Sequence, residues 1–277
     1  MERLKAWTHG HPAESAGLVL LAYLGYFTLP SLLSRQAFGN SVSGATVQGM
    51  TSTLWPEIWL VLSICLVLTL MGAWGKIGLR RPDAPSWKRP VFFAYLLTAL
   101  LLALAVFLLN GAQGFALGWR LVVTIFATTF LVGFFEEVLF RGLVMHGLSA
   151  RFGPVKGLLI TSILFGAMHL VNWVNGQTLD ATVVQCLHAG AAGFLYGALA
   201  LRTGSLWPSI LLHGLWDGTI TLFSAVAGDP ANAAAPDQGT GDLVFQLLFF
   251  GYEPVVAAII LAVWGVQHRK GLHPADA

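Results

Sequence analysis

The chain has 277 residues, of which 56% are hydrophobic and 10% charged, and its formal net charge is +2. Soluble globular domains carry about 25% charged residues, so this chain has too few charges to cover a water-exposed surface. The small net charge and the lack of a long basic face argue against a nucleic-acid partner. These numbers favour an integral membrane protein in contact with the lipid bilayer, with residues 1–277 forming a single all-α transmembrane domain.

Eight apolar runs are long enough to cross a bilayer, which takes about 20 residues in a helix. They cover residues 17–33, 56–75, 91–110, 119–147, 155–172, 181–201, 205–226 and 243–266. The first run follows Arg3 and Lys5, as in a signal peptide. Its polar lead-in is long, however, and no A-x-A motif follows Leu33, so we interpret it as a retained span.

Basic residues alternate between the loops that join these runs. Lys and Arg lie before the first span, in the loops after the second, fourth and sixth spans, and after the eighth span. The alternate loops contain only Arg35 and, at a span edge, Arg120. Cytoplasmic loops carry the excess of Lys and Arg, so the pattern predicts a multi-pass bundle of about eight helices with both termini in the cytoplasm.

Ionisable side chains are concentrated in the fourth to seventh spans, whereas the first three contain almost none. The members are Glu136, Glu137, Arg141, His146, His169, His188, His213 and Asp217. Such a group at the centre of a membrane helix costs about 2.5–3.5 kcal/mol, so intramembrane charges mark functional sites by default. This contrast predicts that residues 119–226 form the catalytic core.

Three short patterns carry these residues: FFEEVLFR in the fourth span, FGAMH in the fifth and HGLWD in the seventh. A separation of four residues puts two side chains on one helix face, so Glu137 is expected to pair with Arg141 and His213 to share a cavity with Asp217. At a rise of about 1.5 Å per residue, Glu136, His169, His213 and Asp217 all lie about 13–18 Å from the inner ends of their spans. These four residues are therefore expected to converge near the bilayer midplane.

A carboxylate and an imidazole together can activate a water molecule, and a second imidazole can donate to a developing oxyanion. The set therefore indicates hydrolysis of an amide bond. The chain has no H-E-x-x-H motif and no G-x-S-x-G motif, which argues against standard zinc and serine designs. We predict no metal cofactor; a zinc ion, if bound, would be held by Glu136, His169 and His213.

Other members of the set have simpler interpretations. His146 and His188 are interpreted as structural histidines that form a hydrogen bond with a neighbouring helix. Glu137 and Arg141 form either an ion pair that locks the fourth span or part of the chemistry itself.

The three patterns, in this order and on these spans, resemble the CPBP family of CAAX prenyl endopeptidases and bacteriocin-processing proteases, also called the Abi or type II CAAX protease family. The family pattern is E-E-x-x-x-R, then F-x-x-x-H, then H-x-x-x-N or H-x-x-x-D, and it covers residues 136–217 here. The resemblance implies that Glu136 is the general base on water, that His169 assists it, and that Arg141 positions the glutamates. It further implies that His213 and the residue at 217 stabilise the oxyanion.

Asp217 leaves three roles open, because an ionised aspartate repels an oxyanion. It is either protonated, or orients His213, or binds a metal.

We therefore predict an intramembrane endopeptidase of the glutamate-dependent CAAX protease type, with a membrane-embedded or lipidated protein or peptide as its partner. Its substrate is expected to be a CAAX-like tail, a precursor peptide or a sorting tail. The composition, rich in Ala, Gly and Trp, favours a bacterial cytoplasmic (inner) membrane. Two alternatives stay open. Intramembrane Glu and His also mark the ion paths of proton-coupled transporters, and a non-catalytic immunity or scaffold protein can use the same fold.

Overall fold

The computed structural model describes residues 1–34, 47–82, 118–227 and 253–266, and all regular elements in these ranges are helices. The N-terminal part contains α1 (Glu2–Gly10), α2 (Pro12–Ser34) and α3 (Val47–Met71). Helix α3 begins nine residues before the predicted span 56–75, because its first turns continue past the apolar run and pack against α7. The buried side chain of Met50 lies in this extension, next to Ile125 and Leu222.

The fourth span is a continuous helical rod of three parts, α7 (Trp119–Glu137), η1 (Val138–Val144) and α8 (Met145–Phe152). The sequence predicts one helix over 119–147, whereas the rod extends to Phe152 and its middle part is a π-helix. π-Helical turns shift the register of the side chains and are frequent at functional sites. Here the π-helix begins directly after Glu136 and Glu137 and contains Arg141.

The fifth span is divided at His169 into α9 (Pro154–Met168) and α10 (Leu170–Val174). The sequence predicts His169 within one helix, but the residue occupies the junction between two. Helices α11 (Leu179–Thr203) and α12 (Trp207–Ala227) follow, and the last helix covers Glu253–Val266. Gly153 lies between α8 and α9 with a φ of +84°, which glycine adopts without steric cost and which permits the sharp reversal.

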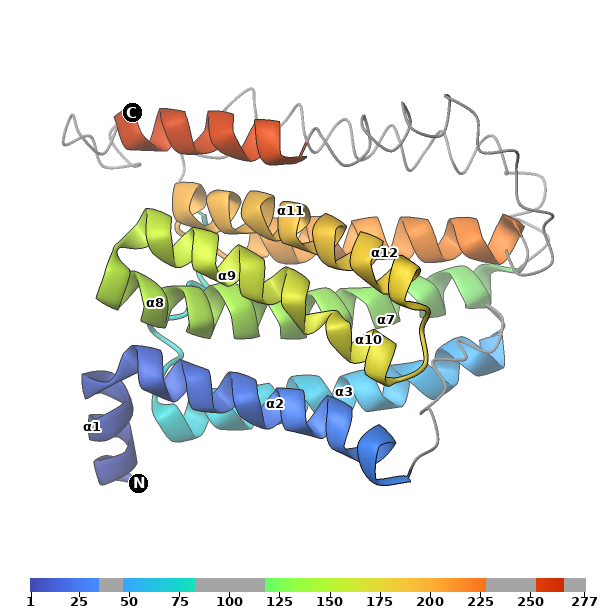
Figure 1. Cartoon of the computed structure of the whole chain (residues 1–277), viewed down its shortest axis with the longest axis horizontal. Helices are drawn as coiled ribbons and strands as arrows, with labels where there is room; N and C mark the ends of the chain where they lie inside the picture. Colours follow the sequence, from blue (N-terminus) through green and yellow to red (C-terminus); the bar gives the residue numbers. More distant parts are fainter. Residues whose placement is uncertain (35–46, 83–117, 228–252, 267–277) are drawn as a thin grey trace.

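The long helices lie side by side along the long axis of the molecule (Figure 1). Helix α12 packs on α7, α11 packs on α9, and α3 packs on α7. Helices α2 and α3 form one layer, and the last helix lies on the opposite side of the bundle. The rod α7–η1–α8 therefore runs through the middle of the fold, where its polar residues are shielded from lipid.

Five helices within the described ranges are long and apolar enough to cross a membrane. They cover Pro12–Leu33, Gly49–Met71, Trp119–Phe152, Pro154–Val174 and Leu179–Thr203. They correspond to five of the eight predicted spans, and α12 occupies the predicted span 205–226. The predicted span 91–110 lies outside the described residues, as does the first part of 243–266. The count of eight and the cytoplasmic location of both termini remain predictions.

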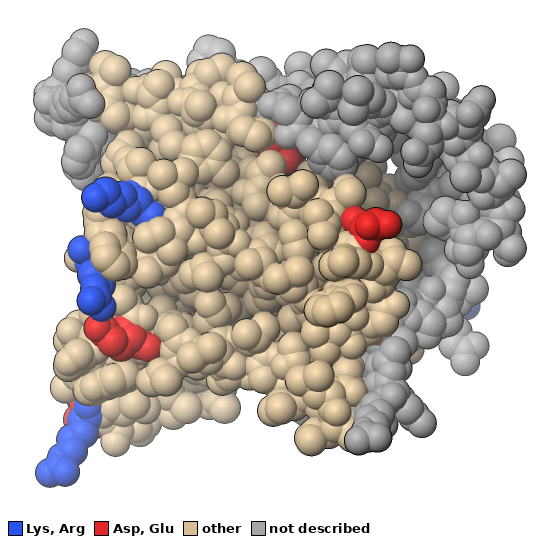
Figure 2. All heavy atoms as spheres, viewed as in Figure 1, with Lys and Arg blue, Asp and Glu red and all other residues tan. Residues whose placement is uncertain are grey.

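Basic side chains gather at one end of the bundle (Figure 2). Lys76 and Arg80 follow α3, and Arg151 lies in the last turn of α8. Helix α11 shows the polarity along its own length, because Asp180 lies in its first turn and Arg202 in its last. We call the end with Lys76, Arg80, Arg151 and Arg202 the basic end.

Candidate active site

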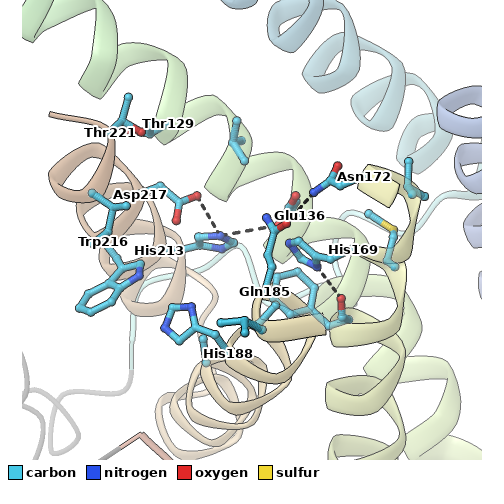
Figure 3. Close-up of a pocket in the computed structure, with 18 of the residues that line it drawn as sticks. Thr129, Glu136, His169, Asn172, Gln185, His188, His213, Trp216, Asp217 and Thr221 are labelled. Carbon is cyan, nitrogen blue, oxygen red and sulfur yellow. Dashed lines mark hydrogen bonds and ion pairs between the residues drawn. The ribbon is translucent and has the colours of Figure 1, made fainter. Parts of the chain in front are cut away.

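A cavity of about 900 Å³ runs from the middle of the bundle to the end where α11 begins. Its walls come mainly from α7, α9, α11 and α12, with contributions from α2, α3 and α10. The four residues predicted as catalytic all line it: Glu136, His169, His213 and Asp217 (Figure 3). The predicted convergence of these side chains is therefore confirmed.

His213 is the centre of the polar cluster, because each of its ring nitrogens faces a carboxylate. Nδ1 lies 3.0 Å from Oε1 of Glu137, and Nε2 lies 3.3 Å from Oδ2 of Asp217 and 3.6 Å from Oε2 of Glu136. An ionised carboxylate only accepts, so Nδ1–H donates to Glu137. His213 is buried, and this hydrogen bond leaves Nε2 as the ring atom that faces the cavity.

Glu137 and Arg141 form a buried ion pair behind the cavity. Nη1 of Arg141 donates to Oε1 of Glu137 at 2.7 Å, and both side chains are at most 1% exposed. The guanidinium also lies over the rings of Phe165 at 4.3 Å and Tyr196 at 5.5 Å, where cation–π attraction adds to the pairing. The predicted pair is confirmed, and it extends as a chain from Arg141 through Glu137 to His213.

His169 is held by its own helix. Its Nδ1 lies 2.9 Å from the carbonyl oxygen of Phe165, and a carbonyl only accepts, so Nδ1–H is the donor. In the neutral ring this bond fixes the tautomer and leaves a lone pair on Nε2. His169 lines the same cavity as Glu136 and is labelled beside it in Figure 3. Its free ring nitrogen can therefore accept a hydrogen bond from a water in the cavity.

Aromatic rings fix the orientation of both imidazoles. The ring of Phe165 meets His169 and His213 edge-on, with centroids 5.3 and 5.9 Å apart, and Tyr196 stacks on His213 at 5.0 Å. Phe165 belongs to the pattern in the fifth span, but sequence reasoning missed Tyr196. Tyr196 lies in the apolar run of α11 and carries no spacing signal that distinguishes it from a packing residue.

Two glycines bring His213 close to the glutamates. A Cβ atom added to Gly133 would lie 3.0 Å from the backbone nitrogen of Gly214, and one added to Gly214 would lie 2.9 Å from Cα of Phe130. Thr129 fastens the same contact, since its Oγ1 donates to the carbonyl oxygen of Gly214 at 2.9 Å. Small residues allow the backbones of membrane helices to approach closely. This approach of α7 and α12 places His213 within hydrogen-bonding distance of Glu137.

An amide pair that sequence reasoning missed lies on the wall of the cavity. Nδ2 of Asn172 donates to Oε1 of Gln185 at 2.9 Å, so this pair links α10 to α11 (Figure 3). Both residues lie near the predicted span ends, where polar residues are common, so the sequence gives no reason to single them out.

A second acid–imidazole pair joins the last helix to α11. Nε2 of His188 lies 3.6 Å from Oε2 of Glu253, which is fully buried, and the His188 ring tilts against Trp216 at 5.6 Å. His188 was predicted to be structural, and its partner is a carboxylate from a distant helix. Glu57 in α3 was also missed; it is half-buried and close enough to Glu136 to interact electrostatically.

Within the described ranges, no three His, Cys, Asp or Glu side chains are grouped as metal ligands. The hydrogen bond of His213 to Glu137 and that of His169 to Phe165 engage one nitrogen of each ring. The zinc site predicted for Glu136, His169 and His213 remains a prediction, as does the prediction that no metal is needed.

Residues 118–219, from the residue before α7 to two residues after Asp217, match the family model described as Type II CAAX prenyl endopeptidase Rce1-like. A comparison with curated proteins and one with solved structures each found no match. The matched segment contains all three patterns and, with the helices that can cross a bilayer, makes this an integral membrane protein. The predicted resemblance is therefore confirmed over residues 118–219, which are similar to the Rce1-like type II CAAX prenyl endopeptidases, a family of proteases.

Proposed function

We propose that the chain is an intramembrane endopeptidase that hydrolyses a peptide bond of a membrane-associated protein with a water activated by Glu136 and His169. The observation that carries this proposal is the joint placement of Glu136, His169 and His213 on one cavity within a bundle of membrane helices. A packed bundle needs no such group of titratable side chains, because each one is costly in lipid. The match of residues 118–219 to a protease family model supports the same conclusion.

In this proposal Glu136 acts on a water that also donates a hydrogen bond to Nε2 of His169. Glu136 takes one proton as the water oxygen attacks the carbonyl carbon of the scissile bond. The C=O electrons move onto the oxygen and form an oxyanion. When the C–N bond breaks, Glu136 returns the proton to the leaving nitrogen, so the carboxylate is regenerated and the products are a carboxylic acid and an amine.

We assign the stabilisation of the oxyanion to His213. Its Nδ1–H is fixed on Glu137, so a protonated ring presents Nε2–H to the cavity. A donor that is oriented before the reaction stabilises developing charge without reorganisation. Arg141 and Glu137 do not line the cavity, and we interpret them as positioning residues that hold the ring through a buried hydrogen bond and ion pair.

Among the three roles left open for Asp217, we propose that it orients His213. Its Oδ2 lies 3.3 Å from Nε2 of His213, and its side chain is 34% exposed and therefore partly hydrated. A carboxyl group at this distance restrains the rotation of the imidazole ring and so keeps Nε2 directed at the cavity. Replacement by Asn is expected to preserve this restraint.

The test is mass spectrometry of peptide termini in membranes that contain either the wild-type protein or Glu136→Gln. Glu14→Gln is the matched control, because Glu14 is exposed at the basic end and pairs with Arg151. We expect new termini with the wild type and the control, and none with Glu136→Gln at equal amounts of inserted protein. The same termini at normal rate in Glu136→Gln would exclude Glu136 as the base, and a change in solute uptake would favour the transporter alternative.

The cleaved protein would also decide the substrate class. We propose that the substrate is a precursor peptide, a sorting tail or a membrane-anchored regulator in the inner membrane of a bacterium. The new termini in the wild-type sample identify which of these is cut.

A further inference from the structure

The charges along the cavity are unbalanced. Its described lining contains three carboxylates and three imidazoles but no Lys or Arg: Glu136, Asp180, Asp217, His169, His188 and His213. The described part of the lining therefore offers no ammonium or guanidinium group to a carboxylate that enters the cavity.

Asp180 marks the open end of the cavity. It lies in the first turn of α11, it is exposed, and it lines the same cavity as the catalytic cluster. An acid in this position stabilises the helix dipole by itself, but this role does not account for its place on the cavity wall. The opening lies opposite the basic end, because Arg202 occupies the last turn of the same helix.

The path from Asp180 to the cluster has a definite length. Tyr196, which stacks on His213, lies sixteen residues after Asp180 on the same helix, so the two levels are about 24 Å apart at a rise of ~1.5 Å per residue. An extended peptide advances about 3.3 Å per residue, so about seven residues span this path. The amides of Asn172 and Gln185 lie on the wall between the two levels and can bind the polar backbone of such a peptide.

We infer that the substrate is an internal, extended segment with a Lys or Arg about seven residues from the scissile bond, where Asp180 receives it, and not a chain end with a free carboxylate. This inference rests on the proposed function and names its substrate class. A C-a-a-X tail ends in a carboxylate three residues after the modified Cys. That carboxylate would lie near Glu136 and Asp217 with no Lys or Arg in the described lining to receive it, and juxtaposed like charges are strongly disfavoured.

The position of the opening leads to the same class of substrate. The positive-inside bias predicts that the basic end faces the cytoplasm, so Asp180 is expected at the other surface of the membrane. A segment on that side reaches the cavity directly, whereas a lipidated cytoplasmic tail would have to cross the bilayer.

The experiment uses the full-length protein in proteoliposomes and a set of peptides with acetylated N-termini, amidated C-termini and a central apolar decapeptide. One Lys is moved stepwise from three to nine residues from the cleaved bond on either side, and matched peptides carry Glu or Gln instead. We expect kcat/KM to be highest for Lys about seven residues away. Asp180→Asn should reduce this preference by about two- to fivefold, the range of a solvent-exposed ion pair.

Asp180→Lys should reverse the preference in favour of Glu, and Glu14→Gln is the control that leaves it unchanged. Equal rates for Lys, Gln and Glu peptides, or preferential cleavage of peptides with a free C-terminal carboxylate, would overturn the inference while the protease function stands. Peptide binding to Glu136→Gln, followed by fluorescence, separates the two claims. If Glu136→Gln binds Lys peptides preferentially but the wild type cleaves none, the proposed protease function would be contradicted. The inference that Asp180 receives a Lys or Arg of the bound segment would then still be supported.

Discussion

The helices that carry the site and the helices that cover it differ in how they are stabilised. In the most apolar 18-residue stretch of each helix, 50% of the residues are buried in α11 and 44% in the rod α7–η1–α8. The corresponding shares are 17% in α2 and 22% in α3. The inner helices hold the chain from Arg141 through Glu137 to His213. The outer pair is linked by a neutral hydrogen bond of 2.7 Å between Tyr23 and Ser63.

This difference shows that charged side chains are stable in a membrane bundle at positions that other helices enclose. Charged groups inside a membrane are tolerated when protein surrounds them and supplies partners. The inner helices meet this condition because glycines let them approach closely, as at Gly133 and Gly214. The outer helices expose many large apolar side chains, such as Leu21 and Leu62, which suit contact with lipid.

The largest effect is expected when the glutamate of an inner helix, Glu136, is compared with that of an outer helix, Glu57. Glu136→Gln should reduce peptide cleavage by about 10²–10⁴-fold, the usual contribution of a general base. Glu57→Gln on α3 should retain activity within a few-fold, because Glu57 does not line the cavity. Cleavage assays in proteoliposomes measure both variants. Equal losses would mean that the outer helices take part in the chemistry and that the comparison is wrong.

The next effect concerns the two Arg–Glu pairs. Arg141→Met should destabilise the protein by about 3–5 kcal/mol, because Glu137 would remain as a buried charge without its cation. Arg151→Gln breaks the exposed pair with Glu14 and should cost less than about 1 kcal/mol. Denaturant unfolding in detergent micelles, followed by tryptophan fluorescence, measures the free energies. The comparison fails if the two variants lose similar stability.

A smaller effect should follow from adding a methyl group to a glycine. A Cβ at Gly166 would lie 2.5 Å from the carbonyl oxygen of Cys186, so Gly166→Ala should separate α9 from α11 and destabilise by about 1–3 kcal/mol. Gly17→Ala in α2 meets no atom within 4 Å and should be neutral or stabilising, by up to about 1 kcal/mol, because Ala is the better helix former. Thermal unfolding of both variants gives the sign, and destabilisation by Gly17→Ala would contradict the open environment of α2.

The smallest effect is expected in the outer pair. Tyr23→Phe removes the hydrogen bond to Ser63 and should cost about 0.6 kcal/mol, the average for such bonds between membrane helices. Cleavage activity should stay at the wild-type level, because neither residue lines the cavity. A loss of several kcal/mol, measured by the same unfolding assay, would show that α2 and α3 are tied together as strongly as the inner helices.

The sequence indicated the residues of the cavity cluster because the cost of intramembrane charge makes each of them conspicuous. Glu136, His169, His213 and Asp217 were predicted on this ground and meet as expected. Tyr196 and Gln185 were missed because an aromatic residue in an apolar run and an amide near a span end are both ordinary. Glu253 was missed because its partner, His188, lies 65 residues earlier and on another helix.

The sequence by itself determined the all-helical class, most of the described spans and the pairing of Glu137 with Arg141, since these follow from local hydropathy and from the spacing of four residues along a helix. Only the tertiary structure decided the π-helix after Glu137, the helix break at His169 and which nitrogen of His213 faces the cavity. These features depend on how closely α7, α9, α11 and α12 approach one another. That distance is set by opposing glycines on different helices, and spacing within one helix carries no information about which glycines meet.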